Sequence, residues 1–213
     1  KFLEENTLDI NFQENIGINE IIKFEDAIKF NDVSLNYDKV NVIKKISFTI
    51  KKGNIFLLKG ESGKGKTSLI DIIVGLIKPT TGFVEIDKIN LNNLNIHEWR
   101  KKISYLSQKP ELFNSTLEDN ITFFNNDQNQ EKLKESIRLS GVGTFIDNLD
   151  NGLKTNVGEF GNKLSGGQKQ RVAISRLINL EKEIFILDEP TSSLDNKSEN
   201  IIINLVRHLK TLE

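Results

Sequence analysis

Residues 60–67 read Gly-Glu-Ser-Gly-Lys-Gly-Lys-Thr and hold three glycines ahead of a lysine and a threonine. The short apolar run 55–58, Ile-Phe-Leu-Leu, precedes them, and an amphipathic pattern over 67–76 follows. A glycine-rich turn between a buried strand and a helix cradles phosphate groups with its backbone N–H groups. Lys66 adds a full positive charge there, and the Thr67 hydroxyl is suited to ligate Mg²⁺. The stretch therefore predicts a nucleotide-phosphate cradle in an α/β protein.

A second glycine-rich stretch, Leu164-Ser-Gly-Gly-Gln168, stands ahead of a long helical pattern over 165–180. Its bare backbone and its hydroxyl are suited to bind an anion at the start of that helix. Ser165 is also suited to cap the helix, and both roles use the same free N–H groups. A flexible turn capped by Ser165 is the plain alternative. One phosphate cradle and a second phosphate-binding helix start suggest that two copies of the chain share the nucleotide.

Two carboxylates, Asp188 and Glu189, follow another short apolar run, Ile184–Leu187. A carboxylate at the carboxyl end of a central strand, beside a phosphate cradle, can hold Mg²⁺ through water. The next residue points to the other side and can accept a proton from an attacking water. The alternative is that Asp-Glu-Pro merely ends a strand and begins a turn. With a cradle in the same chain, we favour Asp188 as a metal ligand and Glu189 as a general base.

The composition excludes several classes of protein and of binding site. The chain has 213 residues, enough for one domain or for one domain with a subdomain. Its 29 Lys and Arg against 30 Asp and Glu leave a net charge of −1, which argues against a nucleic-acid partner or a polybasic membrane surface. It contains no cysteine, so disulfides and thiolate metal sites are excluded. No apolar run approaches the ~20 residues of a membrane-spanning helix.

Hydrophobic periodicity predicts two kinds of strand. Alternation over 28–50 and again over 84–91 predicts half-buried antiparallel strands. The continuous apolar runs 55–58 and 184–187, with 103–107 as a third candidate, instead predict strands of a parallel sheet. We expect the first two of these runs to be buried on both faces.

Helical patterns alternate with the apolar runs. They cover 67–76, 131–139, 165–180 and 197–212, whereas 109–164 contains no strand run. Strands that alternate with helices predict a parallel α/β core. We therefore expect an α/β fold with a parallel sheet, an N-terminal antiparallel β-subdomain and an inserted helical subdomain.

The order of these features resembles the ATP-binding-cassette (ABC) ATPase family of P-loop NTPases, over about residues 28–213. That order is the cradle, Gln108, Leu-Ser-Gly-Gly-Gln, Asp188-Glu189, and then Ser193-Leu-Asp195. The five-residue stretch is specific to this family among cradle-bearing ATPases. The resemblance implies that Tyr37 stacks on adenine and that Gln108 senses Mg²⁺ and the attacking water. It also implies that residues 193–195 cross between paired domains.

The resemblance further implies an ATP site divided between two copies. Mg-ATP lies on the cradle of one copy, and Ser165, Gly167 and Gln168 of the other copy close over its γ-phosphate. The implied catalytic residues are Glu189, Gln108 and Lys66, and the implied Mg²⁺ ligands are Thr67, Gln108 and Asp188. The implied ATP contacts are Tyr37, Gly60, Ser62, Gly63, Lys64, Gly65, Lys66, Thr67, Ser68, Ser165, Gly166, Gly167, Gln168 and Asp195.

Two segments resemble the exporters of this family. Thr155–Gly161 resembles the loop that contacts the transmembrane partner, and Gln108–Ile121 resembles the exporter form of the segment after the glutamine. They imply an exporter in which residues 1–23 link a transmembrane domain to the cassette, residues 24–213, whose helical subdomain is about 109–164. The implied setting is the cytoplasmic face of a bacterial inner membrane, where two cassettes pair through ATP.

Two further expectations accompany this hypothesis. The family has a histidine that contacts the γ-phosphate after one further strand, and neither His97 nor His208 matches it. We therefore expect a C-terminally incomplete cassette with weak ATPase activity. The alternative function is a soluble ATP-driven clamp or switch, as in relatives linked to translation and to chromosomes. Long coiled-coil insertions or two cassettes in one chain would favour that alternative, and the sequence has neither.

Overall fold

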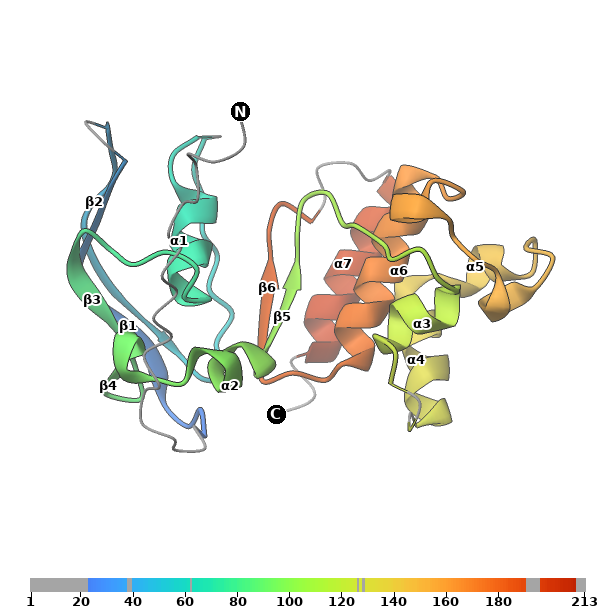
Figure 1. Ribbon diagram of the computed structural model, residues 1–213, viewed down its shortest axis with the longest axis horizontal. Coiled ribbons are helices and arrows are strands. Elements are labelled where there is room, and N and C mark those ends of the chain that lie inside the picture. Colours follow the sequence, from blue (N-terminus) through green and yellow to red (C-terminus); the bar gives the residue numbers. More distant parts are fainter. Residues whose placement is uncertain are drawn as a thin grey trace, which may run out of the picture. The chain divides into compact units, whose positions relative to one another are not determined.

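The computed structural model describes residues 23–37, 40–61, 63–125, 127, 129–190 and 196–209, without the side chains of 196–199 and 208. The chain divides into two compact units, which are described separately (Figure 1). Unit 1 comprises residues 1–52 and 56–100, and unit 2 comprises residues 53–55 and 101–213. The predicted linker, residues 1–23, lies almost wholly outside the described residues.

Unit 1 contains an antiparallel sheet of four strands in the order β2-β1-β3-β4 (Figure 1). The strands are β1 (Ala27–Tyr37), β2 (Val40–Lys51), β3 (Thr81–Ile86) and β4 (Ile89–Asn90), followed by a 3-10 turn, η1 (Leu91–Asn93). The antiparallel pairing confirms the prediction from the alternating pattern.

A bulge in β1 keeps the apolar side chains of that strand on one face of the sheet. The pairing register shifts between Phe30 and Val33, and Asp32 lies there with φ 47°. The extra residue of a bulge shifts the alternation of side chains by one position, so that the apolar side chains after it face the same side as those before it. As a result Phe30 and Val33 are both buried. Gly82 lies opposite with φ 75°, and a Cβ on it would stand 2.4 Å from the Asp32 carbonyl oxygen.

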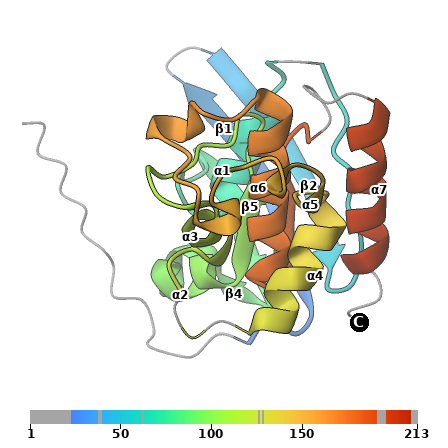
Figure 2. The same cartoon turned by 90° about the vertical axis from the view of Figure 1, so that its right-hand side faces the viewer.

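Helix α1 (Lys66–Ile73) lies over one face of this sheet and follows the glycine-rich turn (Figures 1 and 2). Its last carbonyls have partners on α2 (Ile96–Lys101). The fully buried Trp99 donates from Nε1 to the Ile73 carbonyl oxygen at 2.8 Å, and Arg100 donates to two carbonyls just beyond it at 3.0 Å each. Since helix ends leave carbonyls unsatisfied, these donors fix where α1 ends.

The prediction of a central strand over 55–58 is wrong for this structure. Residues 54–60 carry no strand assignment, and the side chains of Ile55, Phe56, Leu57 and Leu58 are 38–70% exposed. The run lies where the chain passes from one unit to the other, with Ile55 in unit 2 and Phe56 in unit 1. A parallel strand exists only where neighbouring strands supply backbone partners, and an apolar run cannot supply them by itself.

Unit 2 holds the parallel pair that the other two apolar runs predict. Strands β5 (Ile103–Leu106) and β6 (Ile184–Leu187) pair in parallel, with Leu106 opposite Leu187. Helices α6 (Gly166–Asn179) and α7 (Asn196–Leu209) pack on them and also confirm the helical patterns. Strand β6 is partly rather than fully buried. The shared core consists of Leu106, Ala173, Ile174, Leu177, Ile178, Ile202 and Leu205.

The region 109–164 is helical and has a core of its own. It contains α3 (Leu117–Thr122), α4 (Gln130–Ser140), α5 (Gly143–Ile146) and the 3-10 turns η2 (Gly152–Lys154) and η3 (Glu159–Gly161). Its core consists of Leu112, Leu117, Ile121, Leu133, Val142, Phe145, Val157, Leu164 and Val172. Because Val172 belongs to α6, this helix contributes to both cores of unit 2 (Figure 2).

Candidate active site

The glycine-rich turn of unit 1 needs glycine at two positions. Gly63 and Gly65 have φ 79° and 83°, a region that residues with a Cβ rarely adopt. Gly65 is the N-cap of α1, and a Cβ on it would stand 2.8 Å from Cγ1 of Val42. Lys66 donates from Nζ to the carbonyl oxygens of Gly60 at 2.9 Å and Glu61 at 3.1 Å. An ammonium group and the N-terminus of α1 thus lie on the same loop, a combination that favours phosphate.

The other predicted residues of unit 1 surround this loop or end the sheet. The Lys64 ammonium lies 3.8 Å from the Glu61 carboxylate. Thr67 is exposed and Ser68 is partly buried, both in the first turn of α1. Tyr37 ends β1 opposite Val40 and is 47% exposed, so part of this residue is accessible to a ligand.

The carboxylates of unit 2 follow directly on β6. The Asp188 N–H donates to the Leu106 carbonyl oxygen at 2.9 Å and so extends the parallel pairing by one step. Tyr105 donates from its hydroxyl to Asp188 Oδ2 at 3.2 Å. Gln108 donates from Nε2 to Glu189 Oε2 at 2.9 Å. The parallel register thus brings Gln108 and Glu189, two predicted catalytic residues, into direct contact.

The stretch 164–168 forms a capping box at the start of α6. The Ser165 hydroxyl accepts from the Gln168 N–H at 3.3 Å, and the Gln168 side chain accepts from the Ser165 N–H at 2.8 Å. The predicted helix cap is therefore confirmed. A Cβ on Gly166 or Gly167 would meet nothing within 4 Å, and neither residue has a left-handed φ. Neither the conformation nor the packing of the described part of the chain requires glycine at these positions.

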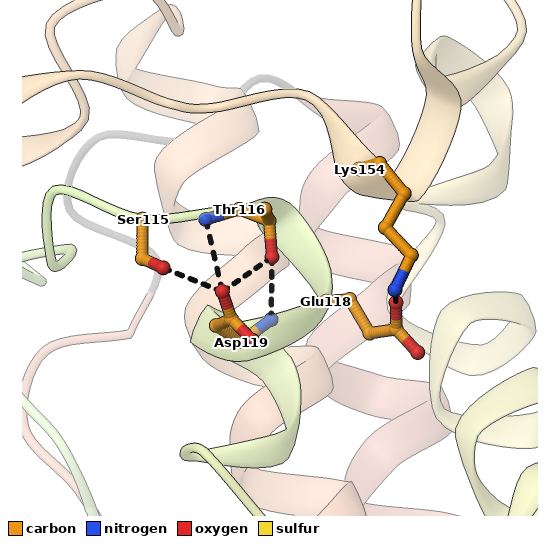
Figure 3. Close-up of polar contacts among 5 residues, drawn as sticks. All are labelled: Ser115, Thr116, Glu118, Asp119 and Lys154. Carbon is orange, nitrogen blue, oxygen red and sulfur yellow. Dashed lines mark hydrogen bonds and ion pairs between the residues drawn. The ribbon is translucent and has the colours of Figure 1, made fainter. Parts of the chain in front are cut away.

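The two exporter-like segments lie side by side in unit 2. The Leu117 N–H donates to the Thr155 carbonyl oxygen, and the Val157 N–H donates to the Ser115 carbonyl oxygen, both at 3.0 Å. The Lys154 and Glu118 side chains form an ion pair at 2.7 Å next to them (Figure 3). The region after Gln108 and the loop before α6 are therefore joined by backbone and side-chain contacts.

Asp119 stabilises this junction. Its carboxylate accepts hydrogen bonds from the hydroxyls of Ser115 and Thr116, the second at 2.7 Å (Figure 3). These two hydroxyls lower the pKa of Asp119 from its ordinary value, because they bind its charged form. Thr116 in turn accepts from the Asp119 N–H at 3.1 Å and caps α3.

Arg176 on α6 holds the segment after Gln108 from the other side. Its guanidinium donates to the Asn120 carbonyl oxygen at 2.6 Å and to Asn120 Oδ1 at 2.9 Å. It also lies 5.5 Å from the ring centroid of Phe113 and 5.8 Å from that of Phe123. Burial lowers the pKa of Arg176. The rings of Phe113, Phe123 and Phe124 are about half exposed, so Arg176 anchors an aromatic surface.

Comparison with known proteins identifies this arrangement. Residues 43–192 match the family model described as ABC transporter. The chain belongs to the ABC transporter family. It is 38% identical over 178 residues to ABC transporter B family member 21 of Arabidopsis thaliana, covering 82% of this chain and 14% of that protein. It is 37% identical over 198 residues to the ATP-dependent lipid A-core flippase of Coxiella burnetii (strain RSA 493 / Nine Mile phase I), covering 92% of this chain and 34% of the flippase.

A solved structure shows the same fold. The chain matches a bacterial Atm1-family ABC exporter with ATP bound at a TM-score of 0.83 and 28% identity, over 89% of this chain and 34% of that one. The chain therefore spans about a third or less of the length of these ABC transporters. Within the described residues, no helix combines the length and the apolar character needed to cross a bilayer. Membership of the family implies ATP binding and hydrolysis by the cassette.

The residues predicted to hold Mg²⁺ are of the kind that this ion takes. Gln108 and Asp188 of unit 2 offer amide and carboxylate oxygens, and Thr67 of unit 1 offers a hydroxyl, all hard oxygen ligands. Mg²⁺ keeps several waters and binds substrate phosphates, so few protein ligands are needed to hold it. The described residues contain no group of three or more His, Asp or Glu side chains placed to hold a metal.

Some residues of the cassette were not predicted, and others cannot be placed. Tyr105, Gln170 and Arg176 were not singled out in the sequence. Gln170 and Arg176 each left a signal, since both are polar residues among the apolar positions of α6. Ser62, residues 193–195 with Asp195, and the side chain of His208 lie outside the described residues.

Proposed function

We propose that this chain is the nucleotide-binding domain, residues 24–213, of a membrane exporter. Two such cassettes pair around Mg-ATP, and hydrolysis lets them part. The observation that carries the proposal is the bare backbone of Gly166 and Gly167 at the capped start of α6. Since nothing within the described residues requires these glycines, a ligand that approaches from outside accounts for them. The paired cassette's nucleotide is that ligand.

The proposed reaction is in-line attack of water on the γ-phosphorus of ATP. Glu189 accepts a proton from the water, while the bond between the γ-phosphorus and the bridging oxygen breaks and ADP leaves. Gln108 orients the Glu189 carboxylate through its amide N–H, and Lys66 balances charge on the β- and γ-phosphates. Tyr37 stacks on adenine. Bound Mg²⁺ supplies further neutralisation of the phosphate charge.

The remaining ATP contacts follow from the shared site. The cradle side consists of Gly60, Ser62, Gly63, Lys64, Gly65, Thr67 and Ser68. The second cassette supplies Ser165, Gly166, Gly167, Gln168 and Asp195. Either two identical cassettes or two different ones satisfy this arrangement.

The proposed partner on the other side is the transmembrane domain of the same transporter, on the cytoplasmic face of a bacterial cell membrane. The joined segments 109–121 and 155–161 form the contact, with residues 1–23 as the connection. Relatives described as a lipid A-core flippase and as an Atm1-family exporter support this setting. The cargo is selected outside the residues of this chain.

The test uses the full-length protein purified from membranes. Wild type hydrolyses Mg-ATP, and Glu189→Gln lowers kcat roughly 10²- to 10⁴-fold because the general base is lost. That variant also accumulates an ATP-bound pair of cassettes, visible by cross-linking. The control, Glu183→Gln, removes a carboxylate paired with Lys102 and keeps normal turnover. Parental turnover in Glu189→Gln rejects the assigned base, and a full-length protein that is not membrane-bound favours the soluble clamp.

A further inference from the structure

Gln170 is a fully buried polar residue on α6, two residues beyond the capping box. Its side chain donates from Nε2 to the carbonyl oxygen of Pro190. Glutamine is seldom fully buried, and a buried amide needs a partner. The partner here is the residue directly after Glu189, so a helix whose first turn carries Gly166 and Gly167 is bonded to the turn that carries the general base.

That turn has a backbone conformation that needs support. Glu189 has φ 45°, in the left-handed region that residues other than glycine rarely adopt. Such conformations persist only where the surrounding structure fixes them. Two hydrogen bonds bracket Glu189, one from the Asp188 N–H to Leu106 and the other from Gln170 to Pro190. The first belongs to the sheet and the second to α6.

Helix α6 is suited to act as a rigid connection between its two ends. Its first turn is closed by the reciprocal bonds of Ser165 and Gln168. Its middle packs into both cores of unit 2 through Val172 and Ile174. A displacement of its first turn is therefore carried to Gln170, and from there to the Pro190 carbonyl.

We propose that Gln170 is a positioning residue that sets the orientation of Glu189 and couples it to the occupancy of the Gly166–Gly167 backbone. When the second cassette's nucleotide engages the start of α6, the Gln170–Pro190 bond brings Glu189 to its working position. This inference rests on the proposed function, since it takes Glu189 as the base and α6 as the contact to the second nucleotide. It adds a link between the two nucleotide sites of a pair.

The test compares two replacements of Gln170 in the full-length protein. Gln170→Met keeps the size of the side chain but cannot donate, and we expect kcat to fall roughly three- to tenfold, as the loss of one hydrogen bond predicts. The KM for ATP changes less than twofold, because Gln170 does not contact the nucleotide. In Gln170→Glu the ionised carboxylate also cannot donate. Burial raises the pKa of such a carboxyl group, and its protonated form can donate to Pro190.

The pH profile separates positioning from a purely structural role. The kcat of Gln170→Glu, divided by that of wild type at the same pH, rises as the pH falls, whereas the ratio for Gln170→Met stays flat. Equal, flat ratios for both variants overturn the proposal, as does wild-type kcat in Gln170→Met. If Gln170→Met does not fold, the pH dependence of the kcat of Gln170→Glu relative to wild type tests the proposal by itself.

A control on the same helix accounts for general destabilisation. Ser175→Ala removes a buried hydrogen bond of 3.1 Å to Ser136 on α4, away from the turn. It lowers thermal stability but leaves kcat within twofold of wild type. A loss of kcat in Ser175→Ala equal to that in Gln170→Met overturns the positioning role. Absence of ATPase activity in wild type overturns the proposed function and this inference together, whereas normal wild-type turnover with unchanged Gln170→Met overturns this inference alone.

Discussion

At the scale of single residues, the two glycine pairs of the cassette differ in what requires them. Gly63 and Gly65 are required by their left-handed backbone, and Gly65 also by the closeness of Val42. Gly166 and Gly167 are required by neither factor. Glycine thus allows the backbone conformation in residues 60–67 and keeps the backbone accessible in residues 164–168. Measurements of stability can separate these two roles.

Replacing Gly167 should separate activity from stability. We expect Gly167→Ala to leave the free energy of unfolding unchanged or to raise it by up to about 1 kcal/mol, since alanine favours helices and meets open space. Its ATPase rate falls roughly tenfold or more, because the methyl group blocks approach to the backbone N–H groups. Gly65→Ala is the matched control and loses about 1–2 kcal/mol of stability. Urea unfolding and steady-state turnover measure both, and equal loss of stability in the two variants contradicts the assignment.

At the scale of elements, the guanidinium of Arg176 joins α6 to the segment after Gln108, in addition to apolar packing. Arg176 bonds twice to Asn120, whose amide also donates to the carbonyls of Phe113 and Thr116 at 3.0 and 2.9 Å. Asn120 is fully buried, and its Oδ1 also accepts from the Phe113 N–H at 2.8 Å, so the loss of Arg176 removes the donor to its backbone carbonyl oxygen and one of two donors to Oδ1. The packing of α3 on α6 therefore depends on a polar contact as well as on apolar side chains.

This dependence predicts a large effect for Arg176→Met. We expect the free energy of unfolding to fall by about 2–4 kcal/mol, since two charged hydrogen bonds are lost and the buried Asn120 carbonyl oxygen loses its donor. Arg138→Met on α4 is the control, because its ion pair with Glu135 is exposed to solvent and contributes little to stability. Chemical denaturation measures the free energy of unfolding of both variants. Similar small losses of this free energy would show that Arg176 is not a structural anchor.

Acid should weaken the junction of the two exporter-like segments. The pKa of Asp119 is lowered in the folded state by the hydroxyls of Ser115 and Thr116. A depressed folded pKa gives stability that is present above the unfolded pKa and is lost as the pH falls through the folded one. The difference in unfolding free energy between wild type and Asp119→Asn is therefore constant near neutral pH and shrinks in the acid range. Urea titrations at stepwise lower pH measure it, and a constant difference throughout contradicts the role of the charged form.

Local patterns predicted much of the fold, and the failures share one cause. The strands β1 and β2 and the helices α1, α4 and α6 follow from periodicity and caps that lie within each segment. The run 55–58 failed because strand pairing depends on partners far away in the sequence.

The same limit applies to the site. Motifs identified Gln108 and Glu189 one at a time, but their hydrogen bond depends on the β5–β6 register. The contacts of Gln170 and Arg176 likewise join positions far apart in the chain.

At the scale of the whole molecule, the shared ATP site predicts complementation between inactive chains. Lys66→Ala disables the cradle and Gly167→Arg disables the start of α6, so a pair of either variant alone has no intact site. In a mixed pair of identical cassettes, one site combines the wild-type cradle of one chain with the wild-type helix start of the other. Equal co-expression therefore restores up to about a quarter of the wild-type ATPase rate. The ATPase rate of full-length chains purified without selection from the co-expression tests the quarter, and mixed pairs isolated through two separate tags reach up to about half. No recovery in either preparation argues that each chain completes its own site.

The double membership of α6 has a consequence for how unit 2 opens. Hydrogen exchange in folded proteins proceeds through cooperative groups of residues that unfold together. Because Val172 packs into the core of the helical region and Ile174 into that of the β5–β6 sheet, losing α6 exposes both at once. The helical region and the β5–β6 sheet therefore belong to one such group rather than to two. Any ligand that restrains the first turn of α6 slows hydrogen exchange in both regions together.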